Sequence, residues 1–237
     1  PRGGGLPPLR EAIAAYHKKL SGQDVTGENV AVVSGAQGGL FAAAMLVLDQ
    51  GDDVVVPEPM YLTYEATFRA AGARIIRVPM RAENEFHLDI VDLEKAITPK
   101  TKAIAFATPS NPTGAMFKRE TLERMARLAM RHDLWVMCDE VYAALSFGNP
   151  HVSIAGLPGM AERTITINSL SKSHAMTGWR VGWIVGPQEL IHFAHDLGLS
   201  TQYGLPGFIQ RAATRALQEP MPFVAEMRDA YRRRRDT

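Results

Sequence analysis

Short apolar runs alternate with amphipathic stretches along most of this chain. Several of the runs are apolar at nearly every position, a pattern typical of strands that are covered on both faces in a parallel or mixed sheet. They predict strands at Val30 to Val33, Asp53 to Val56, Arg74 to Val78, Ala103 to Ala107, Leu134 to Cys138, Thr164 to Ile167 and Val181 to Val185.

Between these strands, the spacing of apolar residues predicts helices. The clearest case has Leu122, Met125, Ala126 and Ala129 at positions i, i+3, i+4 and i+7, which is one face of a helix. Further helices are predicted at 38–48, 62–71, 189–197, 208–217 and 227–235. Strands that alternate with helices predict an α/β layered domain. The glycines at 3–5 and the prolines at 7 and 8 are interpreted as a loop that leads into this domain.

Composition and charge narrow the class of function. The chain has 237 residues, enough for a substantial core, and its 26 Lys and Arg nearly balance its 25 Asp and Glu. No apolar stretch is long enough to span a bilayer, and the single Cys138 excludes an internal disulfide. We therefore expect a cytoplasmic protein with a buried thiol, no metal site, and neither nucleic acid nor membrane as a partner.

The segment from Asn168 to Arg180 is the most informative stretch of the sequence. It places Lys172 in a loop rich in small hydroxyl residues, directly after a predicted strand, with Arg180 eight positions further on. The amine of such a lysine can form a Schiff base, and the guanidinium can bind a phosphate. Taken alone, however, a lysine is usually a solvated surface group, so the interpretation depends on the other loops.

Three other loops follow predicted strands, and ligand sites in such sheets lie where these loops converge. The glycine-rich turn 34–39 opens a helix and could bind a phosphate, or its glycines could be purely structural. Asn111 lies between two prolines, which could hold its amide rigidly or simply form a turn. The acidic pair Asp139 and Glu140 ends an apolar run, and either residue could open into a site or cap a helix.

Four motifs in these loops carry a family resemblance: Gly-Ala-Gln-Gly at 35–38, Asn-Pro-Thr-Gly at 111–114, Asp-Glu-Val-Tyr at 139–142, and Ser-Leu-Ser-Lys at 169–172 with Arg180. In this order and spacing, the chain resembles the large domain of a fold type I pyridoxal-phosphate-dependent (PLP) aminotransferase of class I/II. The resemblance implies a three-layer α/β/α, aspartate aminotransferase-like fold with a mostly parallel mixed sheet. It places the large domain at 1–220 and the start of a helix towards a missing small C-terminal domain at 221–237.

The same resemblance implies roles for the residues around the pyridine ring. Lys172 would carry pyridoxal 5'-phosphate as a Schiff base and afterwards shuttle the proton. Asp139 would pair with the pyridine nitrogen, while Tyr142 and Asn111 would hydrogen-bond the 3′ oxygen of the ring. Tyr61 would stack on the ring, although a lone tyrosine is otherwise an ordinary half-buried aromatic residue.

The phosphate would lie against the backbone of Ala36 and Gln37 and the side chains of Ser169 and Arg180. His174 has two interpretations: a residue that lines the site, or a structural histidine.

The resemblance implies an aminotransferase that moves an amino group from an L-amino acid to a 2-oxo acid, as a homodimer. Segments 58–64 and 173–183 look most similar to bacterial arginine–pyruvate transaminases, which suggests pyruvate as the acceptor. No arginine occurs from Thr201 to Gln210, which argues against a dicarboxylate donor. Two alternatives remain open: a PLP-dependent carbon–sulfur lyase, and an aminotransferase-like sensor domain of a transcription regulator.

Overall fold

A seven-stranded mixed sheet forms the centre of the protein, which is described here by a computed structural model covering residues 4–219 and 221–237. The strand order is β1-β7-β6-β5-β4-β2-β3, and β7 runs antiparallel to both of its neighbours while the remaining pairs are parallel. The strands are β1 (Val30–Ser34), β2 (Asp53–Glu58), β3 (Arg74–Pro79), β4 (Thr101–Ala107), β5 (Trp135–Asp139), β6 (Thr164–Ser169) and β7 (Val181–Val185). The mostly parallel mixed sheet is therefore confirmed, and every predicted strand is present to within two residues.

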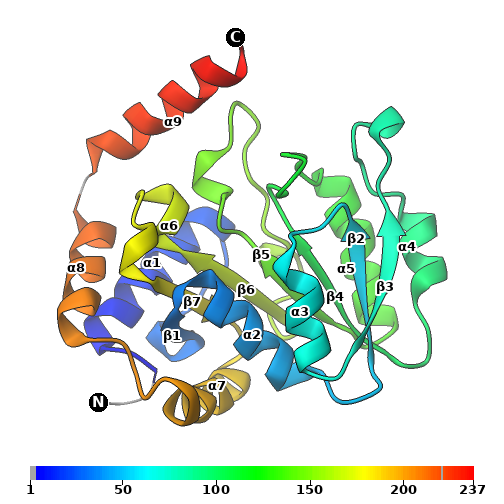
Figure 1. Ribbon diagram of the computed structural model, residues 1–237, viewed down its shortest axis with the longest axis horizontal. Helices are drawn as coiled ribbons and strands as arrows, with labels where there is room; N and C mark the ends of the chain where they lie inside the picture. The colour runs from blue at the N-terminus through cyan, green and yellow to red at the C-terminus, as the bar shows by residue number, and fades with distance from the viewer. Residues whose placement is uncertain (1–3, 220) are drawn as a thin grey trace.

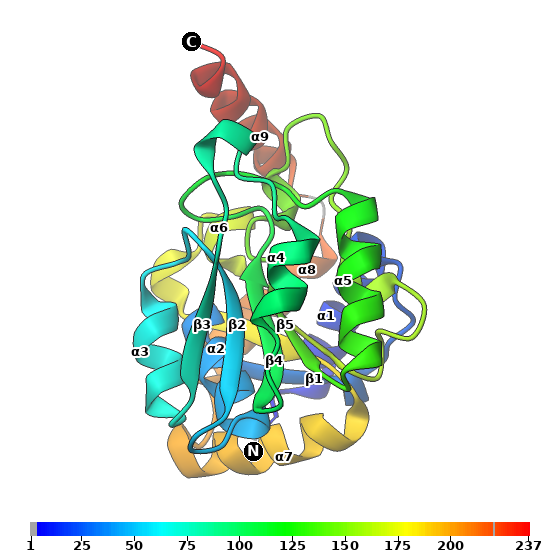
Figure 2. The ribbon, with the colours of Figure 1, turned by 90° about the vertical axis from the view of Figure 1, so that its right-hand side faces the viewer.

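Helices cover both faces of the sheet, and Figure 2 shows α2 and α3 on one side with α1 and α5 on the other. The α-helices are α1 (Pro7–Ser21), α2 (Gly35–Val47), α3 (Thr63–Ala70), α4 (Ile90–Ala96), α5 (Arg119–Arg131), α6 (Leu170–Ser173), α7 (Gln188–Thr201), α8 (Gly207–Gln218) and α9 (Pro222–Arg235). Short 3-10 turns lie at η1 (Gly27–Asn29), η2 (Ala82–Asn84), η3 (Ala143–Leu145), η4 (Ile154–Gly156) and η5 (Thr177–Trp179).

The core is divided between the two faces of the sheet because successive strand residues point in opposite directions. On β5, Met137 packs towards α2, α3 and α7, whereas Val136 and Cys138 pack towards α4 and α5. A third cluster joins α1 and α8 to β1 and β7 around the fully buried Trp183. Cys138 is a buried free thiol, as predicted.

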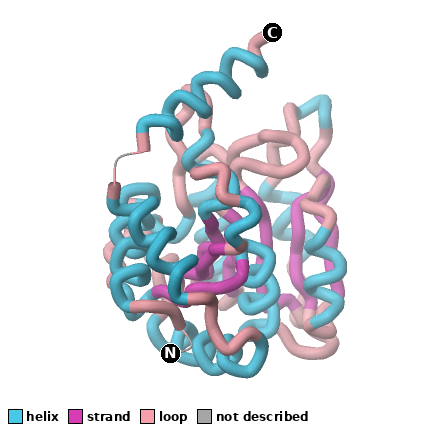
Figure 3. The backbone as a smooth tube through the Cα atoms, turned by 60° about the vertical axis from the view of Figure 1, so that its left-hand side comes forward, coloured by secondary structure: helices cyan, strands magenta, loops and turns pink. Residues whose placement is uncertain are grey.

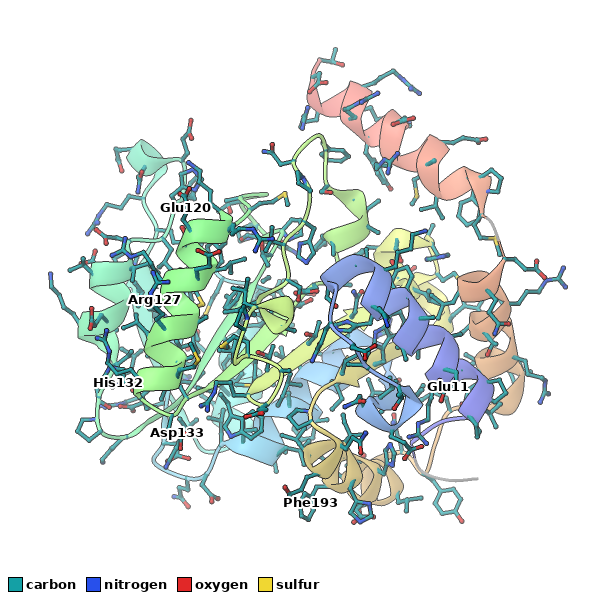
Figure 4. The ribbon with its side chains drawn as sticks, turned by 180° about the vertical axis from the view of Figure 1, so that it is seen from behind. Glu11, Glu120, Arg127, His132, Asp133 and Phe193 are labelled. Carbon is teal, nitrogen blue, oxygen red and sulfur yellow. The ribbon has the colours of Figure 1, made fainter. Side chains whose placement is uncertain are left out.

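The amphipathic pattern of α5 is realised as expected. Leu122, Met125 and Ala129 are buried, and Figure 4 shows Glu120 and Arg127 pointing away from the sheet on the outer face of the same helix. This division of apolar and charged side chains is what the 3.6-residue period predicts for a helix that covers a sheet.

Three α-helices were not predicted from the sequence: α1, α4 and the four-residue α6, which holds Lys172 where a loop was predicted. The prolines at 7 and 8 were interpreted as part of a loop, which is wrong, because α1 begins at Pro7. Proline is favoured in the first turn of a helix, where its missing N–H group would have no partner inside the helix. The short α4 also escaped prediction because its seven residues cover too few turns to show a period. Gly3, in the expected loop, and Pro220, at the expected domain boundary, lie outside the described residues.

The last helix differs from the others in its packing. None of the residues of α9 is buried, and Figures 1 and 3 show this helix extending beyond the layered body. It begins at Pro222, five residues before the predicted start at Met227, and its basic run from Arg232 to Arg235 is exposed, as expected of a solvated helix.

Candidate active site

All the residues that the sequence singled out as a cofactor site line one cavity of about 280 Å³. They are Ala36, Gln37, Tyr61, Asn111, Asp139, Tyr142, Ser169, Lys172 and Arg180. The parallel strands β4, β5 and β6 are neighbours, so the loops that follow their carboxyl ends meet at the same edge of the sheet. The cavity therefore lies where this sheet architecture places ligand sites.

Lys172 is held by the four-residue helix α6. The helix is anchored at its start by the fully buried Leu170, and it is capped by Ser169, whose hydroxyl oxygen accepts a hydrogen bond from Ser171 N at 3.3 Å. The Lys172 ammonium lies 5.8 Å from the centroid of the Tyr142 ring. Among the described residues, no carboxylate forms an ion pair with this lysine, so its amine is available for chemistry.

Asp139 is the last residue of β5, and its carboxylate opens into the cavity. Burial raises the pKa of Asp139 to about 6, although a hydrogen bond from Val141 N lowers it, and the charge of Glu140 raises it further. The bond from Val141 N is 3.1 Å long, so Asp139 also closes the local turn. The residue therefore faces the site, as one interpretation of the sequence predicted, but it caps no helix: its side chain closes a turn, and the N-cap of the following η3 is Tyr142.

An opening suited to an anion lies between the start of α2 and Arg180. Gly35 has a φ of +72°, and a Cβ atom there would collide with the Arg180 guanidinium. A Cβ atom on Gly182 would likewise collide with the backbone of Gly35 and Ala36. The two glycines therefore allow an arginine and a helix N-terminus to lie side by side, and Ser34 leaves that N-terminus without a side-chain cap. Free N–H groups and a guanidinium are the donors that bind phosphate.

The side chain of Gln37 is occupied elsewhere. Its amide nitrogen donates to Thr67 Oγ1 at 2.9 Å, and its amide oxygen accepts from the Thr63 hydroxyl at 2.7 Å, which ties α2 to α3. The backbone N–H of Gln37 is therefore the group left to face an anion, in agreement with the backbone role that the sequence predicted.

Two further residues form the walls of the cavity. Tyr61 is half-buried and packs edge-on against Tyr64, with 6.2 Å between the ring centroids, so its ring is both a core residue and a wall of the site. Asn111 lies in a turn closed by Gly114 N donating to Ser110 O, and it still reaches the cavity. Asn111 is therefore both part of a turn and a residue that lines the cavity.

Sequence reasoning missed two polar residues of the cavity, Ser171 and Thr177. Both stand inside the segment from Asn168 to Arg180, so the abundance of hydroxyl groups in that segment was the signal for them. His174, in contrast, does not line the cavity. It is buried, its Nδ1 lies 2.8 Å from Ser173 Oγ, and its ring packs edge-on against Tyr16, so the structural interpretation holds.

The described residues fit pyridoxal phosphate in four separate respects. Lys172 offers an unpaired amine, and the opening beside Arg180 offers donors for a phosphate. Asp139 is a carboxylate without a cationic partner, which suits the protonated nitrogen of a pyridine ring. Tyr61 adds an aromatic face at the cavity wall. Within residues 4–219 and 221–237, no cluster of metal-ligating side chains and no helix long and apolar enough to cross a membrane are found.

Comparison with known proteins agrees with this geometry. The family model "Aminotransferase class I and II" matches residues 1–237. The chain is 53% identical over 232 residues to the arginine–pyruvate transaminase AruH of Pseudomonas aeruginosa, covering 98% of this chain and 59% of that protein. It is 39% identical to an aspartate aminotransferase of Streptomyces avermitilis, covering 99% of this chain and 58% of the relative.

Solved structures give the same result. The structure of aspartate aminotransferase from Thermus thermophilus with maleate matches with a TM-score of 0.96 and 37% identity, covering 99% of this chain and 62% of that one. This likeness confirms the aspartate aminotransferase-like fold. The chain spans about 60% of the length of the relatives it matches. On its sequence and its fold together, the chain belongs to the class I and II aminotransferase family.

Proposed function

We propose that the full-length protein is a PLP-dependent aminotransferase, which moves an amino group from an L-amino acid to a 2-oxo acid. The observation that carries this proposal is the convergence of a lysine amine, an unpaired carboxylate and an arginine on one cavity at the carboxyl ends of parallel strands. The matched relatives are named as aminotransferases, which favours transamination over the lyase and sensor-domain alternatives.

Lys172 is the centre of the proposed chemistry. Bound pyridoxal phosphate supplies the electron sink and the amine carrier, while the protein orients and polarises it. Lys172 would hold the cofactor covalently, and its freed amine would take the α-proton of the substrate and return it. The Tyr142 ring lies close to this amine, with its centroid 5.8 Å away.

Asp139 would keep the pyridine nitrogen protonated. Two unit charges about 4 Å apart interact by about 4 kcal/mol at an effective dielectric constant of about 20, which is enough to hold a proton in place at neutral pH. Asn111 and Tyr142 would hydrogen-bond the 3′ oxygen of the ring. These two contacts would fix how the ring lies between Lys172 and Tyr61.

The phosphate would bind at the start of α2. Arg180 presents a planar guanidinium there, and the backbone N–H groups of Ala36 and Gln37 open the helix beside it. Ser169, which is fully buried, would add a hydroxyl donor. Together these donors would hold the phosphate end of the cofactor in place.

For the substrates, we propose arginine as a donor and pyruvate as an acceptor. The support is the 53% identity to a protein named arginine–pyruvate transaminase, together with the absence of any arginine from Thr201 to Gln210 that could bind the second carboxylate of a dicarboxylate donor. A donor screen with pyruvate as the acceptor tests this point, and a preference for aspartate over arginine would contradict it.

We also propose that the protein is a homodimer. Large apolar side chains are exposed on the packed helices α2 and α7: Phe41 and Met45 on the first, Leu199 on the second and Tyr203 just after it. Light scattering on the full-length protein should give the mass of a dimer, and Met45→Glu should weaken the dimer. A cytoplasmic location remains a prediction from the cysteine content.

The division into domains also remains a proposal. The lack of buried residues in α9 supports a change of packing after about residue 220, where a small C-terminal domain would begin in the full-length protein.

Absorption spectroscopy tests the proposed function most directly. Full-length protein reconstituted with pyridoxal phosphate should show the absorption band of a lysine-bound cofactor, which bleaches on addition of an amino acid and returns with pyruvate. Lys172→Ala should lack that band and should not turn over. Lys102→Ala, on the surface of β4, is the matched control and should behave as the wild type. A band that persists in Lys172→Ala would refute the proposed role of the lysine.

A further inference from the structure

A second group of titratable side chains lies buried behind the wall of the cavity and has no part in the function proposed above. The side chains of Glu140 and His151 are 1% and 4% exposed, and His17 is a buried residue. They come from three separate places in the chain: the turn after β5, the segment before η4, and helix α1. None of them lines the cavity.

Glu140 is the charged centre of this group. One of its carboxylate oxygens lies 3.2 Å from His151 Nε2, at ion-pair distance but without an aligned hydrogen bond. The other oxygen lies 3.6 Å from Cys138 Sγ. Burial raises the pKa of Glu140, but interactions with His151, Ser153 and His17 outweigh it and leave the pKa below its ordinary value. The surroundings of Glu140 therefore favour its ionised form.

The charge of Glu140 also acts on His17. Burial lowers the pKa of His17, and the 2.8 Å contact with Gln23 Oε1 and the charge of Glu140 offset this only in part, so the pKa stays below its ordinary value. His17 thus brings α1 into the group, and His151 brings in the segment that precedes η4. A buried carboxylate is strongly destabilising when its partner is removed, so this arrangement depends on His151.

The backbone of Glu140 links the group to the active site. Its N–H donates to Ile167 O of β6, and its carbonyl accepts from Ala143 N of η3, both at 2.9 Å. Glu140 therefore occupies the middle of the turn that presents Asp139 on one side and Tyr142 on the other. A Glu140 side chain held by His151, on the side away from the cavity, would therefore fix the directions in which Asp139 and Tyr142 enter the cavity.

We propose that His151 and Glu140 form a positioning pair that aligns Asp139 and Tyr142 for the cofactor. The proposal rests on the function proposed above, since it assigns a purpose to residues that touch neither substrate nor cofactor. Supporting residues of this kind decide whether a site is held tightly enough for its chemistry.

The test uses His151→Ala in the full-length protein, with His195→Ala as the matched control. His195 is a half-buried histidine on α7, whose Nε2 lies 3.3 Å from Val30 O, and it lines no part of the cavity. For His151→Ala we expect kcat to fall roughly tenfold to a hundredfold while KM for the amino donor changes less than about threefold. His195→Ala should change neither parameter.

A second measurement does not depend on turnover. In the cofactor-free protein, amide hydrogen exchange in the peptide that contains Val141 and Tyr142 should become at least about tenfold faster in His151→Ala, because the turn is held less firmly. His151→Gln, which places an amide N–H at a similar reach, should recover most of kcat and of the slow exchange. If His151→Ala does not fold, kcat and amide exchange are compared between His151→Gln and the wild type instead.

A double-mutant cycle completes the test. The two residues are proposed to act as a unit. The kcat of the double variant Glu140→Gln, His151→Ala should therefore lie within about threefold of the kcat of the less active single variant. Additive losses, or a folded His151→Ala with normal kcat and normal exchange, would overturn the proposal. Wild-type protein without turnover or a cofactor band would instead refute the proposed function, while the exchange experiment would still report on the pair.

Discussion

Replacing Asp139 by asparagine should stabilise the cofactor-free protein while removing its activity. The pKa of this carboxyl is raised from 3.8 to about 6, with burial as the main cause. At pH 7 the carboxyl is ionised in both states, but its ionisation is less favourable in the folded protein than in the unfolded chain. Each pKa unit corresponds to about 1.4 kcal/mol, so the charge destabilises the cofactor-free fold by about 3 kcal/mol.

The sign of the pH dependence follows from the same values. Below pH 3.8 the carboxyl is protonated in both the folded and the unfolded states, so it contributes no difference. Between pH 3.8 and about 6 the unfolded state ionises first, and the folded state loses stability as the pH rises. The amide of the Asp139→Asn variant would carry no charge, and its oxygen could still accept the hydrogen bond from Val141 N. The advantage of the variant should therefore be largest above about pH 6 and should vanish near pH 4.

Urea unfolding of the cofactor-free full-length protein measures this effect. We expect Asp139→Asn to raise the free energy of unfolding by about 1–3 kcal/mol at pH 7.5, and to equal the wild type at pH 4. With cofactor and substrates present, the same variant should lose transamination by orders of magnitude. A variant that is less stable than the wild type at pH 7.5 would show that Asp139 is satisfied by the protein, and the reasoning about its missing partner would be refuted.

Three other changes test the geometry. Gly35→Ala should weaken cofactor binding about tenfold, because the left-handed backbone costs a side chain about 1–2 kcal/mol and the new Cβ displaces Arg180; cofactor titration measures this. Gly38→Ala is its control, since the nearest atom to an added Cβ is 3.7 Å away, and it should bind normally. Asp53→Asn should lower the free energy of unfolding by about 2 kcal/mol without altering kcat, because it removes the negative charge and one of the two oxygens that accept from Arg74, at the opposite end of β2; equal stability would contradict this. Since the hydrogen bond from Arg74 lowers the pKa of Asp53, that contribution should be lost in the wild type as the pH falls through the folded pKa.

Much of the site was predictable because two regularities act together. Apolar runs located the strands, and the carboxyl ends of parallel strands share one edge of a sheet, so Asn111, Asp139 and Lys172 had to approach one another once β4, β5 and β6 proved to be neighbours. The prolines at the start of α1 were misread for a different reason. The same residue type breaks a helix in its interior and begins one in its first turn, so composition alone does not decide between the two.

The sequence could not separate the roles of Asp139 and Glu140, which are adjacent carboxylates with the same local context. Their directions follow from the strand, since successive side chains at the end of β5 point to opposite sides. Their partners follow from parts of the chain that are distant in sequence: Glu140 meets His151 and His17, whereas Asp139 meets no cation among the described residues.

The two pKa shifts express this difference as opposite signs on neighbouring residues. The pKa of Glu140 lies below its ordinary value because imidazoles of the protein already stabilise its charge, and the pKa of Asp139 lies above its own because burial acts without a cation to offset it. A fold selected for stability alone would pair or remove the second carboxylate, since an unpaired charge in a partly buried position is unfavourable. Its retention at the wall of the cavity is accounted for if a positively charged group enters with a ligand, as a protonated pyridine nitrogen would. The carboxylate that the protein leaves without a partner is therefore the one proposed to bind the cofactor, and the carboxylate that it satisfies is the one proposed to hold its neighbour in place.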